Sequence, residues 1–146
     1  MSHVAEVDDA MTGKVAHFEI PADDVERAKG FYRDAFGWTM DPVPNMDYTL
    51  VRTTEVDERG VPKEPAVING GLMKRQAQVE HPVITVVVEN IDASLKTIKK
   101  LGGKTAQKKM PIPGIGFSAC FVDSERNLMG LFEPTGEMQR RASGSP

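Results

Sequence analysis

A strand followed by an amphipathic helix, over Val15–Thr39, is the feature that most constrains the fold of this chain. Its first six residues mix β-branched, aromatic and apolar side chains, and Pro21 follows them, which predicts a strand that ends at the proline. Asp23 stands three residues before Glu26, the spacing of a helix capping box. Apolar residues then recur at helical spacing until Gly37, at Val25, Ala28, Phe31, Tyr32, Ala35 and Phe36. The segment therefore predicts a helix that packs its apolar stripe on the strand.

The same pattern returns 66 residues later, which indicates an internal duplication. Residues 83–88 (VITVVV) are the most apolar run of the chain, and Asn90 or Asp92 can cap the helix that follows. That helix is expected to end at Gly102–Gly103. Three further strands are predicted after each helix, at 48–53, 66–69 and 70–75 in the first half and at 104–109, 117–122 and 128–133 in the second. Both halves therefore read βαβββ, and the fold class is α+β.

The length of 146 residues favours one domain built from these two halves. We expect a flexible leader over 1–13, a single folded domain over 14–134 and a disordered tail over 135–146. Within the domain, module one spans 14–76 and module two spans 82–134.

The charge and cysteine content of the chain limit the kinds of molecule that it is expected to bind. The chain has 18 basic and 21 acidic residues, a formal net charge of −3, which argues against a nucleic-acid surface and gives no reason to expect a membrane surface. Cys120 is the only cysteine, so an internal disulfide is excluded. The N-terminus lacks the pattern of a secretory signal, and a cytoplasmic location is expected. A small organic molecule is the partner that this composition favours.

The span from about Gly13 to Glu133 resembles the vicinal oxygen chelate superfamily, which includes glyoxalases, bleomycin-resistance proteins and extradiol dioxygenases. The stretches that carry the resemblance are HFEIPADDVERAKGFYRDAFGW, the Gly70–Gly71 pair, IDASLKTIKKLGGK and DSERNLMGLFE. In the last of these, Ser124 and Arg126 depart from the family's usual Asp-Pro-Asp/Glu-Gly-Asn turn, and the left-handed position of that turn is left without a glycine.

The resemblance implies two tandem βαβββ modules whose mixed sheets curl into a cleft. It also implies a small organic ligand in that cleft, a divalent metal in many members, and assembly as a homodimer. Among the enzymes, the chain resembles proteins related to lactoylglutathione lyase and dioxygenases.

Most of the positions that carry metal ligands in the family hold residues that are unsuited to coordinate a metal in this chain. In the metal-dependent members the ligands come from the first and last strands of each module, and His17 matches the first of them. The equivalent position in module two is Val83, the last-strand position of module two is Gly130, and that of module one falls near Asn69. We therefore expect no metal cofactor, since one imidazole cannot hold a divalent ion alone. An irregular site that combines His17 with Glu19 and His81 is the alternative.

Two candidate catalytic residues, His17 and Glu19, lie on one face of the first strand because side chains alternate along a strand. They can form a metal-free acid–base pair. The alternatives are a cleft histidine that is hydrogen-bonded to a neighbour, and a Glu19 that pairs with an Arg or Lys. The candidate ligand-binding residues are His17, Trp38, Tyr48, Met73, Phe117, Phe121 and Phe132. Trp38 can instead belong to the core, and alternation allows only about half of the strand residues to face a cavity.

Two functional hypotheses follow. The first is a metal-free protein that binds a small, partly apolar organic molecule in the cleft, as resistance-type members of the family do. The second is an enzyme, a lyase, isomerase or dioxygenase, that uses His17 and Glu19 for acid–base chemistry or to hold an irregular metal.

Overall fold

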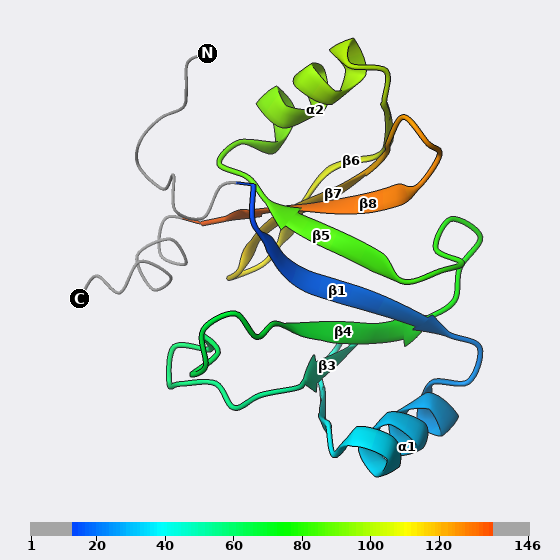
Figure 1. Cartoon of the computed structure of the whole chain (residues 1–146), viewed down its shortest axis with the longest axis vertical. Helices are drawn as coiled ribbons and strands as arrows, with labels where there is room; N and C mark the ends of the chain where they lie inside the picture. The colour runs from blue at the N-terminus through cyan, green and yellow to red at the C-terminus, as the bar shows by residue number, and fades with distance from the viewer. Residues whose placement is uncertain (1–12, 136–146) are drawn as a thin grey trace. The chain divides into compact units, whose positions relative to one another are not determined.

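The computed structural model describes residues 13–135, and Figure 1 shows its order of helices and strands. The expected leader and tail therefore lie outside the described residues, apart from their innermost positions. The described residues form two compact units, one of residues 16–84 and one of residues 85–135 together with 13–15. Residues 13–15 join the second unit because Gly13 donates to the Val87 carbonyl over 2.7 Å and Val87 donates to the Lys14 carbonyl over 2.9 Å.

The two modules have the same topology. Module one consists of β1 (Val15–Ala22), α1 (Val25–Phe36), β2 (Thr39–Pro42), β3 (Thr49–Arg52) and β4 (Asn69–Lys74). Module two consists of β5 (Val83–Val87), α2 (Ile91–Lys100), β6 (Lys104–Ile112), β7 (Gly116–Val122) and β8 (Leu128–Pro134). The strand orders are β2-β3-β4-β1 and β5-β8-β7-β6. In each module the first and last strands pair in parallel and the other neighbours pair antiparallel. The α+β class and the mixed sheet of the predicted fold are confirmed.

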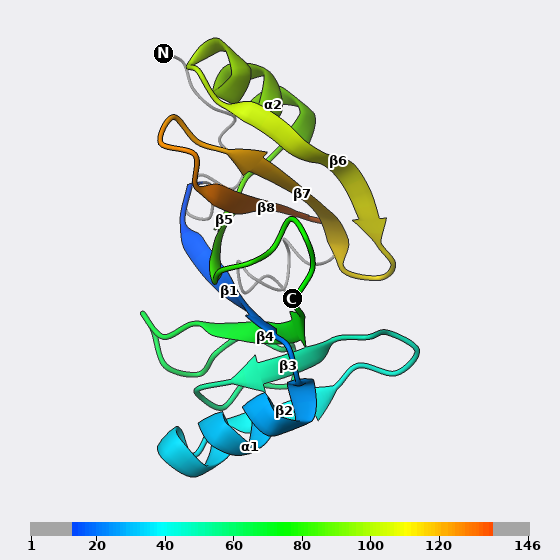
Figure 2. The ribbon, with the colours of Figure 1, turned by 90° about the vertical axis from the view of Figure 1, so that its right-hand side faces the viewer.

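Each helix covers one face of its own sheet. In module one, α1 packs against a buried cluster of Ala22, Val51 and Leu72, and Figure 2 shows it lying along β2 and β3. In module two, α2 packs against Ala119 and Leu131. None of the described helices is long and apolar enough to cross a membrane.

The cap of α1 differs from the predicted one. Asp24, and not Asp23, is the N-cap, and its side chain accepts from the Arg27 N–H over 3.0 Å. Asp23 instead pairs with Arg75. The strand before the helix also continues through Pro21 to Ala22, because the fixed φ of proline suits extended backbone and only its N–H donor is missing.

The strands of module one differ from the prediction in two places, whereas the strand predicted at 48–53 is present as β3. Residues 39–42 form β2, a four-residue strand that was not predicted from the sequence, and it pairs antiparallel with β3. The predicted strand 66–69 is absent before Asn69, because Ala66 has a φ of 70° and cannot continue a strand.

The turn between β7 and β8 places a non-glycine residue in the left-handed region, since Arg126 has a φ of 70°. The Asp123 carboxylate closes this turn by accepting from the N–H groups of Asn127 and Glu125, over 2.9 and 2.8 Å. The hydrogen bond from Asn127 is the main reason that the pKa of Asp123 is lowered from its usual value.

We expect Arg126→Gly to stabilise the protein by about 1 kcal/mol, because a side chain in the left-handed region costs about that much. The melting temperature, measured by circular dichroism, should rise by about 3 °C. Ser124→Gly is the matched control, because Ser124 lies in the same turn without a positive φ. An equal rise in both variants would show that the backbone of Arg126 is unstrained.

Candidate functional site

Three side chains of module one form a hydrogen-bonded group, which we call the polar trio: His17, Glu19 and Tyr48. The Tyr48 hydroxyl donates to the Glu19 carboxylate, over 2.9 Å to Oε1 and 3.1 Å to Oε2. His17 Nε2 lies 2.8 Å from the Tyr48 oxygen and 3.1 Å from Glu19 Oε2. Two acceptors therefore surround Nε2, which assigns the ring proton to that nitrogen.

The polar trio lies on the face of the sheet that α1 does not cover. Residues that alternate with the core positions of β1 point away from the helix, and these are His17 and Glu19. Their side chains are 31% and 24% exposed, so the trio is half-buried and within reach of a ligand. Tyr48 directly precedes β3 and reaches the two residues of β1 across β4.

A glycine on β4 leaves the space through which the Tyr48 side chain extends to His17 and Glu19. Gly71 of β4 is paired with Glu19 of β1, and a Cβ on Gly71 would lie 1.6 Å from the Tyr48 hydroxyl oxygen. Because non-bonded atoms cannot approach so closely, any larger residue at position 71 would displace Tyr48.

The surroundings of Tyr48 hold its phenol in the neutral form. Burial is the main reason that the pKa of Tyr48 is raised far above its usual value, and the charge and hydrogen bond of Glu19 add to the effect. The phenol is thus a hydrogen-bond donor at all physiological pH values and does not act as a tyrosinate base.

Apolar side chains border the trio. Leu50 of β3 pairs with Gly71, and Met73 follows Gly71 by two positions on β4, so both share the face of the trio. Of the predicted ligand-binding residues, the structure therefore brings Tyr48 and Met73 to the same face as His17.

Trp38 lies elsewhere in module one. Its indole stacks on Tyr32 with ring centroids 5.0 Å apart and lies 6.0 Å from the ring of Phe18, which packs against the core cluster on the α1 side. This is the core position that the sequence analysis gave as the alternative for Trp38.

The three predicted aromatic residues of module two divide between the faces of its sheet. Phe117 and Phe121 pack with the core cluster that α2 covers. Phe132 alternates with Leu131 of that cluster and so lies on the opposite face, with Gly130. Contact of these three residues with a ligand stays a prediction.

Strand register identifies the equivalent positions of the two modules. Thr85 stands 66 residues after Glu19, and it pairs with Gly130 of β8 as Glu19 pairs with Gly71 of β4. The counterpart of Gly130 in module one is therefore Gly71, two residues beyond the position near Asn69 that the sequence suggested. Sequence alone could not place it, because the pairing of parallel strands depends on register.

The residues present do not fit the metal ion of the fold family. Both last-strand positions are glycines, and Val83 offers no ligand atom. The side chain of Asn69 is already hydrogen-bonded to the backbone, since its Oδ1 accepts from the N–H groups of Thr53 and Thr54 over 2.7 and 3.1 Å. Within residues 13–135, no three or more His, Cys, Asp or Glu side chains gather as a metal site, and this includes the irregular combination with His81.

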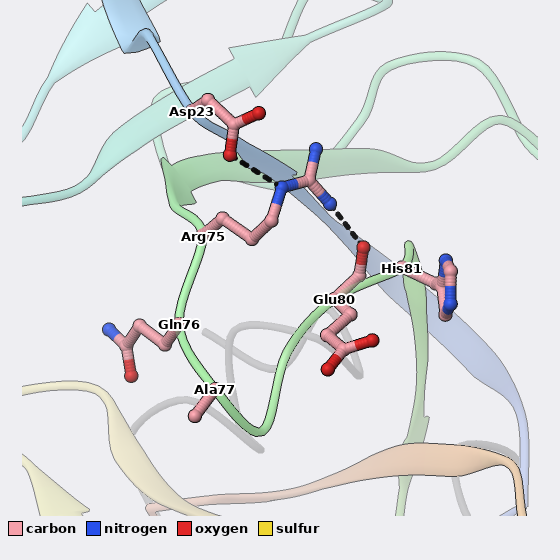
Figure 3. Close-up of a pocket in the computed structure, with 6 residues that line it drawn as sticks. All are labelled: Asp23, Arg75, Gln76, Ala77, Glu80 and His81. Atoms are coloured by element: carbon pink, nitrogen blue, oxygen red, sulfur yellow. Dashed lines mark hydrogen bonds and ion pairs between the residues drawn. The ribbon is translucent and has the colours of Figure 1, made fainter.

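His81 lines a separate hollow, which Figure 3 shows beside the loop after β4. The hollow has a volume of about 500 Å³. Its lining residues are Asp23, Arg75, Gln76, Ala77, Glu80 and His81. Arg75 is already bound there, to Asp23 over 2.8 Å and to the Glu80 carbonyl. None of the polar trio lines this hollow.

Comparison with known proteins agrees with this architecture. Residues 14–54 match the family described as bleomycin resistance protein-like N-terminal. A glyoxylase-like domain-containing protein of Didymella fabae is 27% identical over 134 residues, which cover 86% of this chain and 97% of that protein. A variant of Streptomyces coelicolor methylmalonyl-CoA epimerase has the same fold, with a TM-score of 0.59, 13% identity and coverage of 86% of this chain and 96% of that one.

The chain therefore resembles the vicinal oxygen chelate superfamily and has its fold. A hypothetical protein from Bacillus halodurans also shares the fold, with a TM-score of 0.56, 13% identity and coverage of 84% of this chain and 95% of that one. The resemblance to glyoxalase-like and bleomycin-resistance-like proteins of this superfamily is thereby confirmed, and the polar trio is the feature of module one that needs a functional explanation.

Proposed function

We propose that this protein binds a small, partly apolar organic molecule on the face of module one that carries the polar trio, without the family's four-ligand metal site. The observation that carries the proposal is the Tyr48 hydroxyl, which lies 2.8 Å from His17 Nε2 and 2.9 Å from Glu19 Oε1. The hydroxyl thus binds both the imidazole and the carboxylate, so these groups are bonded to protein atoms and not arranged as ligands around an ion.

The surroundings support a ligand of mixed polarity. Small-molecule sites combine apolar walls with a few placed polar groups, and here Leu50 and Met73 supply the apolar part while the trio supplies the polar part. The match of residues 14–54 to a bleomycin-resistance-like family supports a binding role for this module.

Metal content and a ligand screen test the proposal together. We expect no stoichiometric divalent metal, by elemental mass spectrometry, after purification without chelator. In a thermal-shift screen of small aromatic and hydroxylated compounds, we expect compounds that stabilise the wild type. A compound at 100 times its Kd should add about 2.7 kcal/mol of stability.

The His17→Ala variant decides whether such compounds bind at the trio. It should lose most of the stabilisation, whereas Arg59→Ala, in the exposed loop of module one, should keep it. A stoichiometric ion that disappears in His17→Ala would overturn the metal-free proposal. Compounds that stabilise both variants equally would place the ligand elsewhere.

The second candidate is an acid–base enzyme, a lyase, isomerase or dioxygenase, which the 3.1 Å contact between His17 and Glu19 favours. The two candidates differ in what happens to a bound compound. A binding protein returns the screened compound unchanged, whereas an enzyme changes its mass, its configuration or its deuterium content in D₂O, which mass spectrometry and NMR detect.

A further inference from the structure

A hydroxyl faces a glycine at the same place in both modules. A Cβ on Gly71 would lie 1.6 Å from the hydroxyl oxygen of Tyr48, and a Cβ on Gly130 would lie 2.7 Å from the hydroxyl oxygen of Thr85. Both distances are shorter than real contacts of a Cβ atom. Each hydroxyl therefore occupies the space where a side chain at the last-strand position of its module would begin.

Only module one adds an imidazole and a carboxylate to this arrangement. The counterparts of His17 and Glu19 in module two are Val83 and Thr85. The hydroxyl of Tyr48 meets both His17 and Glu19, whereas the corresponding position of module two carries a valine in place of the imidazole. Module two is thus an internal control for the role of the hydroxyl.

We propose that Tyr48 is the positioning residue of the ligand site, that its hydroxyl holds His17 and Glu19 together in place of an ion, and that Gly71 is required to seat it. The inference rests on the proposed function, because it concerns the same face of module one.

A tyrosine hydroxyl can do this because it both donates and accepts. The Glu19 carboxylate can only accept, so Tyr48 donates to it and its oxygen accepts from the Nε2–H of His17. This network keeps the proton on Nε2. A protonated ring nitrogen has no lone pair for a cation, so the network withholds Nε2 of His17 from metal ions.

A double-mutant cycle tests the seating of Tyr48 by Gly71. We expect Gly71→Ala to lower the melting temperature by about 5 °C, because the added Cβ displaces the phenol. In a Tyr48→Ala background the clash is gone, and the same substitution should cost less than about 1 °C. Gly130→Ala is the matched control, and its cost should be the same in both backgrounds.

Equal costs of Gly71→Ala with and without Tyr48 would overturn the proposal. If Gly71→Ala does not fold alone, its recovery in the Tyr48→Ala background shows the same coupling, and failure of both to fold would count against it.

Zinc ion is the probe for the positioning role. Tyr48→Phe keeps the ring and removes only the hydroxyl, so it should release Nε2 of His17 and raise the affinity for Zn²⁺ at least about tenfold over wild type in calorimetry. The gain should vanish when His17→Ala is added. Tyr32→Phe, the same change in the aromatic cluster of α1, should give no gain.

Failure of this inference and failure of the proposed function are distinguishable. Neither the cycle nor the zinc measurement needs the organic ligand. If Tyr48→Phe binds zinc no better than wild type, the positioning role is wrong whatever the ligand screen finds. If both measurements succeed but no compound binds at the trio, the positioning role stands and the proposed function fails.

Discussion

Gly70→Ala should lower the free energy of unfolding by about 3 kcal/mol, because the glycine is closed in by backbone. A Cβ on Gly70 would lie 2.5 Å from the carbonyl oxygen of Phe18 and 2.4 Å from its ring, in the strand that pairs with β4. The Phe18 carbonyl cannot move aside without breaking hydrogen bonds between β1 and β4. The clash therefore lowers the free energy of unfolding directly. Urea denaturation followed by circular dichroism measures the loss.

Gly30→Ala is the matched control for that substitution. Gly30 lies inside α1, and a Cβ there would meet only the flexible end of Arg33, at 3.4 Å. Alanine is the better helix former by about 1 kcal/mol, so the control should gain stability. The account of Gly70 would be wrong if its alanine variant lost less than about 1 kcal/mol.

Ile91→Ala should lower the free energy of unfolding by about 3 kcal/mol, because it removes a side chain with 0% exposure at the start of α2. The residue packs with Ala119 and Leu131, and its N–H donates to Glu133 Oε1 over 2.8 Å. Truncation leaves a cavity under the helix, since these neighbours are held by the strands.

The same denaturation experiment on Ile84→Ala gives the control. Ile84 is 47% exposed, so its truncation should change the free energy of unfolding by less than about 0.5 kcal/mol. Similar losses in the two variants would mean that Ile91 does not anchor α2.

Much of the fold could be predicted because its signals are local. Gly37 adopts the left-handed conformation at the end of α1, with a φ of 75°, and Asn90 caps α2 by accepting from the Ala93 N–H. Such residues act on their own neighbours and need no knowledge of the tertiary structure. The repeated βαβββ pattern followed from them.

The errors fall where distant segments decide the outcome. The four residues of β2 carry no strong strand pattern and are extended because β3 pairs with them. Likewise, capping-box spacing favoured Asp23, but that carboxylate is taken by Arg75, 52 residues further along the chain. Spacing within a segment cannot reveal such a competitor.

The candidate site was predictable in part. His17 and Glu19 were placed on one face by strand alternation alone, and the structure has them 3.1 Å apart. The link from Tyr48 to both was not predictable, because it spans 31 residues to His17 and 29 to Glu19 and depends on the register that sets Gly71 against the phenol.

The hydrogen bonds of Asn69 affect how readily the loop between β3 and β4 can change in length. The Asn69 side-chain oxygen accepts from the N–H groups of Thr53 and Thr54 and so links the end of β3 to the start of β4. The two ends of the loop between these strands are therefore held close together. Residues 55–67 can then gain or lose length without shifting the strands that carry the site. An insertion in this loop should therefore disturb the sheet of module one less than an insertion between two directly paired strands.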